Sequence, residues 1–251
     1  MAAILNTTGY DVDAQMGGAS PSNRSEITNE ALITKSSSEE VLGVAGLRKM
    51  AADYYAWRNE NYPVRSSDAG LHTWDNKLTD YSPVKIAARA QHVRSLLEKV
   101  RAIKIDKWPK DEQIDAILFR AQLEAVDFGN RVLKFEQTNP QVYVGECTSG
   151  IFSLLKKEYD TPRNRALTAT ARLKEMPALL KQGLSNLQSP VKLYAQLAMQ
   201  SARSIDPLLN NSLMALDVDL APNEHDELVR ARDAALAALH GYADELEKRL
   251  P

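Results

Sequence analysis

Hydrophobic residues recur every three or four positions along most of this chain, which is the spacing of helices that bury one side. The pattern is regular behind Pro83, where Ile86, Ala90, Val93 and Leu97 follow one another at steps of four, three and four. No run of alternating residues indicates a strand, and no fixed period indicates a repeat. We expect helices over about 39–61, 83–100, 114–138, 149–159, 162–186, 190–205, 207–217 and 224–250.

Three of these helices are expected to begin in the same way, with a hydroxyl residue followed by proline. The pairs are Ser82-Pro83, Thr161-Pro162 and Ser189-Pro190. The hydroxyl can accept a hydrogen bond from a free backbone N–H group, and proline at the first helical position gives up no bond. Ser38 is the expected cap of the first helix, and Asn223 is the expected cap of the last one.

The clearest apolar stripe lies before the Asn139-Pro140 pair, which should end its helix. We expect this stripe to face the core, and its members are Ile114, Ile117, Ala121, Ala125, Phe128, Val132 and Phe135. The next segment, VYVGECTSG, is expected to be a glycine-bearing loop that leads into a short helix over SGIFSLLKKEY.

The predicted fold is all-α: a multi-helix antiparallel bundle with long helices, one of them kinked near Pro177. Proline removes an internal hydrogen bond, which should bend the helix near Leu173 or Lys174. Residues 1–37 are rich in Ser, Thr, Asn and Gly without apolar periodicity, so they are expected to form a disordered leader. Residues 38–251 are expected to form one helical domain.

Composition narrows the classes of partner. The chain has 251 residues, with 31 Lys and Arg against 33 Asp and Glu. This near balance gives no attraction for a polyanion, so nucleic acid is not an expected partner. No apolar run is long enough for a membrane span or a signal peptide, so the default localisation is cytoplasmic and the chain is expected to be soluble. One cysteine, Cys147, allows no intramolecular disulfide.

The histidines do not form a recognisable metal motif. A zinc peptidase typically carries H-E-x-x-H, which places two histidines one helical turn apart on one face. The nearest approach is NEHDE, in which His225 is followed by the next histidine, His240, only fifteen residues later. We interpret NEHDE as a helix start, and His72 and His92 as surface or packing residues.

Other candidate chemistry also has a simpler structural interpretation. Cys147 could be activated by the start of a helix, but no histidine can be placed beside it, so an inert thiol is expected. Asp75 and Asp80 could act as a paired acid and base, although turn-forming aspartates in a polar loop account for them too. The YYAWR aromatics could line a pocket or pack in a core. No phosphate-binding loop is present.

The order of several motifs resembles a bacterial family, domain of unknown function 885 (DUF885). DYYAWRNENYPVRSSDAGLHTWDNKLTDYSP is similar to its P-x-x-A-T-x-x-G-x-x-x-x-D-x-x-L-x-D-x-S-P signature, and the resemblance continues to YADELEKRLP over roughly residues 45–251. The chain departs from it at Val64-Arg65-Ser66-Ser67, where the family favours a small-residue Ala-Thr pair. The matching positions are Pro63, Gly70, Asp75, Leu78, Asp80, Ser82 and Pro83.

The resemblance implies a helical zinc metallopeptidase whose H-E-x-x-P-G-H type motif lies in a carboxy-terminal half. The chain is then expected to be the amino-terminal portion of such a hydrolase, inactive alone. Its implied partner is a missing carboxy-terminal half or a peptide ligand, and zinc is implied for full-length relatives only. No catalytic, cofactor-binding or metal residue can be named in this chain. Exported relatives carry leaders, which leaves an extracytoplasmic localisation open.

Two alternatives remain at this point. The first is a non-catalytic helical binding or scaffold module for a peptide or protein partner. The second is a metal-independent enzyme that uses scattered carboxylates. HTWDNKLTDYSPVK, residues 72–85, is interpreted as a structured connector and helix entrance and not as an active site.

Overall fold

The structure is a computed structural model that describes residues 43–249, and this part of the chain is helical without a strand. The predicted all-α class is therefore confirmed. The predicted leader over residues 1–37 and the predicted cap Ser38 lie outside the described residues.

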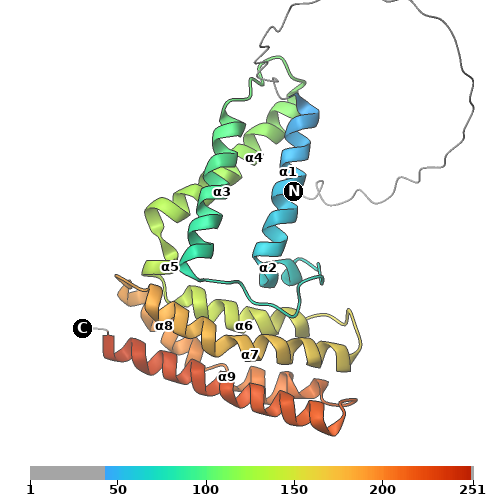
Figure 1. Cartoon of the computed structure of the whole chain (residues 1–251), viewed down its shortest axis with the longest axis vertical. Coiled ribbons are helices and arrows are strands. Elements are labelled where there is room, and N and C mark those ends of the chain that lie inside the picture. Colours follow the sequence, from blue (N-terminus) through green and yellow to red (C-terminus); the bar gives the residue numbers. More distant parts are fainter. Residues whose placement is uncertain (1–42, 250–251) are drawn as a thin grey trace, which may run out of the picture. The chain divides into compact units, whose positions relative to one another are not determined.

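Three long helices form a first layer. They are α1 (Val44–Asn61), α3 (Pro83–Arg101) and α4 (Lys110–Phe128), and Figure 1 shows them standing together above the other helices. Their facing sides enclose a core of buried residues whose aromatic members, Tyr54 and Phe119, pack edge to face. The core residues are Leu47, Tyr54, Val93, Leu97, Val100, Ala116, Phe119 and Leu123.

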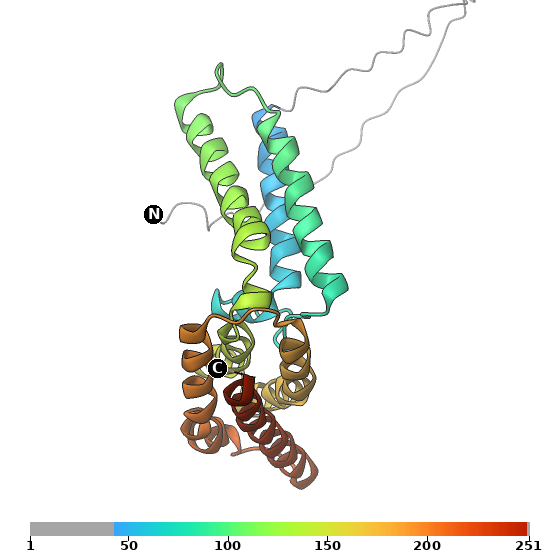
Figure 2. The ribbon, with the colours of Figure 1, turned by 90° about the vertical axis from the view of Figure 1, so that its left-hand side faces the viewer.

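Four further helices form a second layer with a larger core. They are α6 (Gln141–Leu155), α7 (Pro162–Asn186), α8 (Lys192–Arg203) and α9 (Pro222–Arg249), and Figures 1 and 2 show them lying across the lower ends of the first layer. Two short helices, η2 (Leu208–Ser212) and η3 (Met214–Leu216), join α8 to α9. Most of the fully buried side chains of the described chain belong to this layer.

Helix directions are mixed in both layers. In the second layer, α6 and α7 are antiparallel, as the bonds from Arg165 near the start of α7 to the end of α6 show. By contrast α7 and α9 run in the same direction, because Arg163 pairs with Glu224 at their starts and Arg249 reaches the Leu184 carbonyl at their ends. The predicted antiparallel arrangement holds for α6 and α7, while the return through α8, η2 and η3 makes α7 and α9 parallel.

Two segments lie between the layers. On one side, the short helix α2 (Pro63–Asp68) and the loop over 69–82 leave α1, cross α6 and α7 and enter α3. On the other side, the π-helical turn η1 (Gly129–Leu133) and α5 (Phe135–Thr138) lead from α4 to α6. Lys134 lies between them with a φ of 46°, in the left-handed region. The single helix expected over 114–138 is therefore wrong: it is interrupted at Lys134, and α2 was not expected from the sequence.

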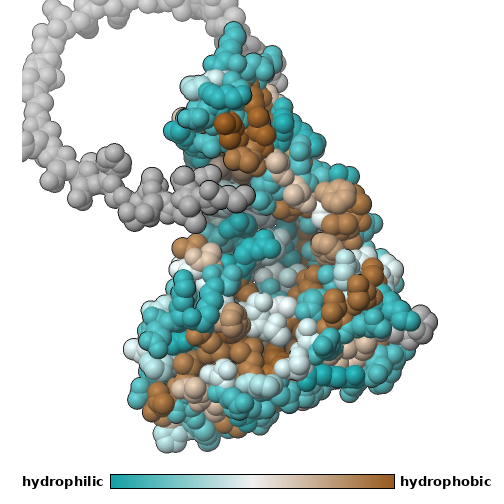
Figure 3. Space-filling view, turned by 180° about the vertical axis from the view of Figure 1, so that it is seen from behind, coloured by the Kyte–Doolittle hydropathy of each residue, from teal (hydrophilic) through white to brown (hydrophobic). Residues whose placement is uncertain are grey.

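The expected core stripe of α4 is wrong: the opposite face of the helix is buried. Ala116, Phe119 and Leu123 pack against α1 and α3, whereas Ile117, Leu118 and Phe128 are 45%, 56% and 48% exposed. We call the exposed row the α4 stripe. Viewed from behind, hydrophobic side chains gather over this helix and the turn after it (Figure 3). The α4 stripe consists of Ile114, Ile117, Leu118, Ala121, Ala125 and Phe128.

The expected loop over VYVGECTSG is also wrong, because all of it belongs to α6. Its two glycines suggested a break, but Gly150 lies where another part of the chain comes very close. A Cβ atom built there would be 2.9 Å from the Leu78 side chain. The close approach of the loop over 69–82 to α6 therefore accounts for this glycine.

Helix starts agree in part with the expected caps. The Thr161 hydroxyl accepts a hydrogen bond from the Asn164 N–H group, as predicted. Ser82 precedes α3 but makes no such bond. α8 begins at Lys192, two residues after the predicted proline.

The cap expected at Asn223 is wrong, since α9 begins at Pro222. The carboxylate of Glu224 instead accepts a bond from the Ala221 N–H group at 3.0 Å, which is the reciprocal half of a capping box. Negative charge was expected in the first turn of this helix, and Glu224 supplies it.

Helix α7 continues through Pro177 for 25 residues without a break. The kink expected near this proline stays a prediction. Within the described part of the chain, no helix combines the length and the apolarity that crossing a bilayer would require.

Candidate functional site

The loop over 69–82 carries several residues that resemble the family signature. Three of them, Gly70, Leu78 and Asp80, have a clear structural role. Gly70 has a φ of 89°, a conformation that favours glycine. Leu78 is buried against Gly150 of α6. The Asp80 carboxylate accepts a hydrogen bond of 2.7 Å from the N–H group of Ser82, directly before α3. The signature therefore marks a segment between the two layers, α2 with the loop over 69–82, which we call the connector.

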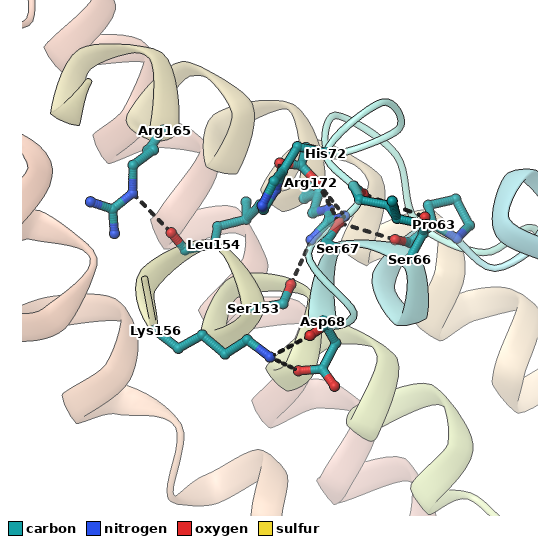
Figure 4. Close-up of polar contacts among 12 residues, drawn as sticks. Pro63, Ser66, Ser67, Asp68, His72, Ser153, Leu154, Lys156, Arg165 and Arg172 are labelled. Atoms are coloured by element: carbon teal, nitrogen blue, oxygen red, sulfur yellow. Dashed lines mark hydrogen bonds and ion pairs between the residues drawn. The ribbon is translucent and has the colours of Figure 1, made fainter. Parts of the chain in front are cut away.

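Arg172 of α7 is the centre of the contacts that hold this connector (Figure 4). Its side chain is fully buried. Its Nε donates to the carbonyl of Lys77 at 3.0 Å, and one terminal nitrogen donates to the Gly150 carbonyl and the Ser153 hydroxyl at 2.5 and 3.0 Å. The other terminal nitrogen donates to the Ser67 hydroxyl at 2.6 Å. One guanidinium group thus ties α2 and the loop to α6 and α7.

Asp75 balances this buried charge and gathers the rest of the cluster. Its carboxylate lies 3.9 Å from the Arg172 guanidinium and accepts a hydrogen bond from the Ser67 hydroxyl. Its second oxygen is 2.7 Å from Nδ1 of His72. The His72 ring stacks on Tyr159 with a centroid separation of 3.5 Å. Burial, followed by the neighbouring Asp75 charge, raises the pKa of the Tyr159 hydroxyl.

A serine, an aspartate and a histidine therefore lie together, but their order differs from that of a catalytic triad. In a triad the histidine stands between the other two and removes the serine proton. Here Asp75 stands between Ser67 and His72. Ser67 is 1% exposed, and its hydroxyl already accepts a bond from Arg172. This arrangement holds the loop and offers no nucleophile to a substrate.

Two glutamates of the second layer bind the backbone of the loop. Glu175 accepts a bond of 2.7 Å from the N–H group of Leu78, and Glu146 accepts one of 2.8 Å from that of Thr79. Burial raises the pKa of Glu146, while the bonds from Thr79 and the charge of Arg172 act in the opposite direction. The loop thus uses long-range side chains where a helix or strand would use its own backbone.

Arg89 secures the other end of the loop. This buried side chain of α3 donates a bond of 2.6 Å to the Asp80 carbonyl. Its guanidinium lies 5.2 Å from the ring centre of Tyr62 and 5.6 Å from that of Tyr81. These distances allow cation–π attraction to both rings. The connector is therefore anchored in both layers by buried arginines.

The histidines considered as metal ligands lie apart from one another, each beside an acid of its own. Nδ1 of His225 is 2.5 Å from Asp217, and Nε2 of His240 is 2.8 Å from Asp206. Over residues 43–249, no group of three or more His, Cys, Asp and Glu side chains is arranged to hold a metal ion.

The aromatic residues of YYAWR belong largely to the core of the first layer. Tyr54 is buried against Phe119, and Trp57 stacks on the His92 ring with a centroid separation of 4.1 Å. Burial lowers the pKa of His92. These contacts favour the packing interpretation of both the aromatics and this histidine.

Cys147 is fully buried in the middle of α6. Burial, with a smaller contribution from Glu146, raises the pKa of its thiol well above the usual range. The residue is not at a helix start, so the environment that could have activated it is absent from this helix. The geometry supports the expected inert thiol.

Arg172 was missed by sequence reasoning, although the sequence carries a signal for it. Along α7 it occupies a position in the buried seam, together with Arg165. A positive charge at a position that periodicity assigns to the core requires a buried partner. The seam runs at steps of four and three through Arg165, Ala169, Arg172, Met176, Leu179 and Gly183.

A comparison with solved structures supports the fold. The chain is similar to a protein from Shewanella oneidensis described as a "putative lipoprotein of unknown function", with a TM-score of 0.69 and 18% sequence identity. The match covers 82% of this chain, and the chain spans 37% of the length of that protein. No curated protein matches the sequence.

A comparison with family models supports the resemblance seen in the sequence. Residues 63–251 match the model of a family described as "Bacterial protein of unknown function (DUF885)". The match begins at Pro63 of the connector and includes the loop, Arg172 and the second layer. The chain therefore belongs to the DUF885 family.

Proposed function

We propose that this chain is a non-catalytic helical portion of a metallopeptidase-like hydrolase and forms one wall of its substrate cleft. The proposal rests on the hydrogen bonds that the polar side chains of the connector make. Its polar groups, including Ser67 and Asp75, are bound to Arg172 inside the protein and are not directed at a substrate. The segment fixes two helical layers against each other, as a rigid cleft wall would require.

The comparison by length supports the same proposal. The similar protein from Shewanella oneidensis is more than twice as long as this chain, which spans 37% of it. In such a longer protein, the zinc ligands and the base that activates water would come from the additional residues. The helices described here would position substrate and exclude water.

The proposal is tested by the size and the activity of the native protein. An antibody raised against residues 43–249 should detect a band well above 27.9 kDa in extracts of the source cells. That larger protein, once purified, should hydrolyse unstructured peptides with zinc and lose the activity with a chelator. The 251-residue chain with added zinc should show no turnover, and peptide hydrolysis by this chain alone would overturn the proposal.

A second candidate function is a binding module for a protein partner, and the α4 stripe favours it. The stripe leaves Ile117, Leu118 and Phe128 about half exposed along one continuous face. Contiguous apolar surface of this kind typically marks an interaction site. This candidate predicts saturable binding of a protein without turnover.

A further inference from the structure

We propose that three arginines around Tyr62 bind the terminal carboxylate of a peptide. Arg58, Arg65, Arg89 and Tyr62 are called the Tyr62 cluster. The inference deepens the proposed hydrolase function by naming a group of its substrate, and the choice of a peptide rests on that function. Binding can be measured on this chain without turnover, so the two proposals can fail separately.

The Tyr62 cluster brings together three helices at one end of the first layer. Arg58 lies in the last turn of α1, where its carbonyl accepts a bond of 2.9 Å from the N–H group of Tyr62. Arg65 follows in α2, and Arg89 lies early in α3. The end of α1, the helix α2 and the start of α3 all lie next to the second layer (Figure 1). The cluster is therefore found where the two layers meet.

Aromatic rings lie against these cations. The Arg89 and Arg65 guanidinium groups are 5.2 and 5.9 Å from the centre of the Tyr62 ring. The Arg58 group is 4.9 Å from the centre of the Tyr55 ring. Such rings attract a cation through their faces, but they carry no negative charge that would balance it.

The three arginines have no acidic partner within residues 43–249. Most other arginines in this part of the chain form an ion pair with a carboxylate, as the buried Arg172 does with Asp75. Arg89 is only 5% exposed, yet no described carboxylate lies within ion-pair distance of it. Buried charge is normally paired, because its desolvation is costly. This cluster therefore points to an anion from outside the described residues.

Two acids lie in the wider surroundings and leave the charge of the cluster unbalanced. Burial is the main cause of the raised pKa values of Tyr62 and Tyr81, and the charges of Glu136 and Glu146 add to it. Neither acid forms an ion pair with the three arginines, and Glu146 already binds the backbone of the loop. Three positive charges thus have only two more distant acids near them.

Several N–H groups of the cluster also lack an acceptor. Nε of Arg58 is buried without a hydrogen-bond partner, and one of its terminal nitrogens has only a long contact of 3.4 Å with Asn59. Arg89 donates a single bond, to the Asp80 carbonyl. Arg65 is exposed and donates no bond within the described chain. Unused donors of this kind call for a ligand with acceptor oxygens.

Exposure rises across the cluster, so that a ligand can approach it from one side. Arg89 is buried, Arg58 and Tyr62 are half-buried, and Arg65 is exposed. A carboxylate that enters beside Arg65 can use both of its oxygens on the paired N–H groups of a guanidinium. The rings of Tyr55 and Tyr62 can pack against the apolar part of the residue that bears the carboxylate. The end of a peptide combines both features.

The first test compares two forms of one peptide. An acetylated tripeptide that ends in phenylalanine carries its only charge on the terminal carboxylate, and the corresponding amide carries none. Isothermal titration calorimetry of the 251-residue chain should show weak, saturable binding of the acid. The amide should bind at least about tenfold more weakly, because it loses charge-assisted hydrogen bonds. Added sodium chloride should weaken binding of the acid.

The second test assigns the binding to the cluster. Arg65→Gln and Arg58→Gln should each weaken binding of the acid about tenfold, and Arg65→Lys should keep part of it because the charge remains. Arg230→Gln is the matched control, since Arg230 is an exposed arginine of α9 that forms no ion pair in the described chain. Arg89 is left in place, because its replacement would also release the Asp80 carbonyl. Circular dichroism checks that each variant is folded.

Three results would overturn the proposal. They are equal binding of acid and amide, no binding of the acid at millimolar concentration, and unchanged binding in Arg58→Gln and Arg65→Gln. Inorganic phosphate that binds as tightly as the acid would overturn the assignment to a carboxylate. Binding of the acid that both variants weaken would support the site even if the longer native protein hydrolysed no peptide, and in that case the hydrolase proposal alone would fail.

Discussion

The ring of Tyr143 lies directly against the Cα atom of Gly183, so that a Cβ atom at position 183 would be 2.6 Å from the ring. Tyr143 cannot move aside easily, since it is fully buried and its hydroxyl donates a bond of 2.6 Å to the Glu136 carbonyl. This contact sets the distance between α6 and α7.

Gly183→Ala should therefore destabilise the protein by about 1–3 kcal/mol, the usual cost of overpacking a core. Gly241→Ala is a matched control, because Gly241 is also inside a helix and has nothing within 4 Å of an added Cβ. That change should stabilise by about 0.4–1 kcal/mol. Urea unfolding followed by circular dichroism measures both, and equal effects would show that the Tyr143 contact is not limiting.

Arg172→Ala should be among the most damaging single changes. It leaves Asp75 and two carbonyl groups buried without their donor, and losing one partner of a buried ion pair costs about 3–5 kcal/mol. Arg203 provides the comparison, since it pairs with Asp244 and Glu247 at the surface. Arg203→Ala should change the free energy of unfolding by less than about 1 kcal/mol. Similar losses for the two variants would contradict the central role of Arg172.

Glu146 should make stability depend on pH. Its pKa is raised in the folded state, so folding favours the protonated form, and that contribution is lost as the pH rises through the folded pKa. Glu146→Gln removes this titration, and its amide oxygen can still accept the Thr79 bond. The free energy of unfolding of the variant, relative to the parent, should therefore increase between pH 4 and pH 7.

Glu245 is the control for this titration. Its pKa is lowered by the neighbouring Lys248, so Glu245→Gln should change the relative stability in the opposite direction over the same pH range. Chemical unfolding at a series of pH values measures both differences. A constant difference for Glu146→Gln would mean that the carboxyl group does not titrate differently in the folded protein.

Cys147 should not react with a thiol reagent in the folded protein, because it is fully buried and its pKa is raised. Labelling should become rapid only in denaturant. Ser149→Cys places a thiol at an exposed position two residues later on the same helix, and it should react at once. Mass spectrometry counts the labelled groups, and equal labelling of both positions would contradict the packing of α6.

Periodicity predicted α4 as a helix but could not choose between its two apolar faces. The stripe from Ile114 and the row through Ala116, Phe119 and Leu123 both have helical spacing, and only packing against α1 and α3 decides which is buried. α7 was predicted over its full length, 162–186, because Thr161 and Pro162 set its start through local chemistry. Local signals therefore gave both ends of α7, while the orientation of α4 depended on packing.

The contacts of the connector were beyond sequence reasoning for a different reason. Arg172, Glu146 and Glu175 reach partners between 67 and 105 residues away along the chain, which no local pattern reveals. Gly150 suggested a break in a helix, whereas it allows Leu78 to approach α6. Ser67 lies where the sequence departs from the resemblance, and its hydroxyl binds Arg172.

The connector also has a consequence for synthesis on the ribosome. Residues 62–82 leave the exit tunnel long before Arg172 does, because its partners Lys77 and Ser67 lie 95 and 105 residues earlier in the chain. The first layer, α1 with α3 and α4, can gather its own core during that interval. Residues 62–82, which link α1 to α3 within this layer, then lack these hydrogen-bond partners until α7 emerges and binds them.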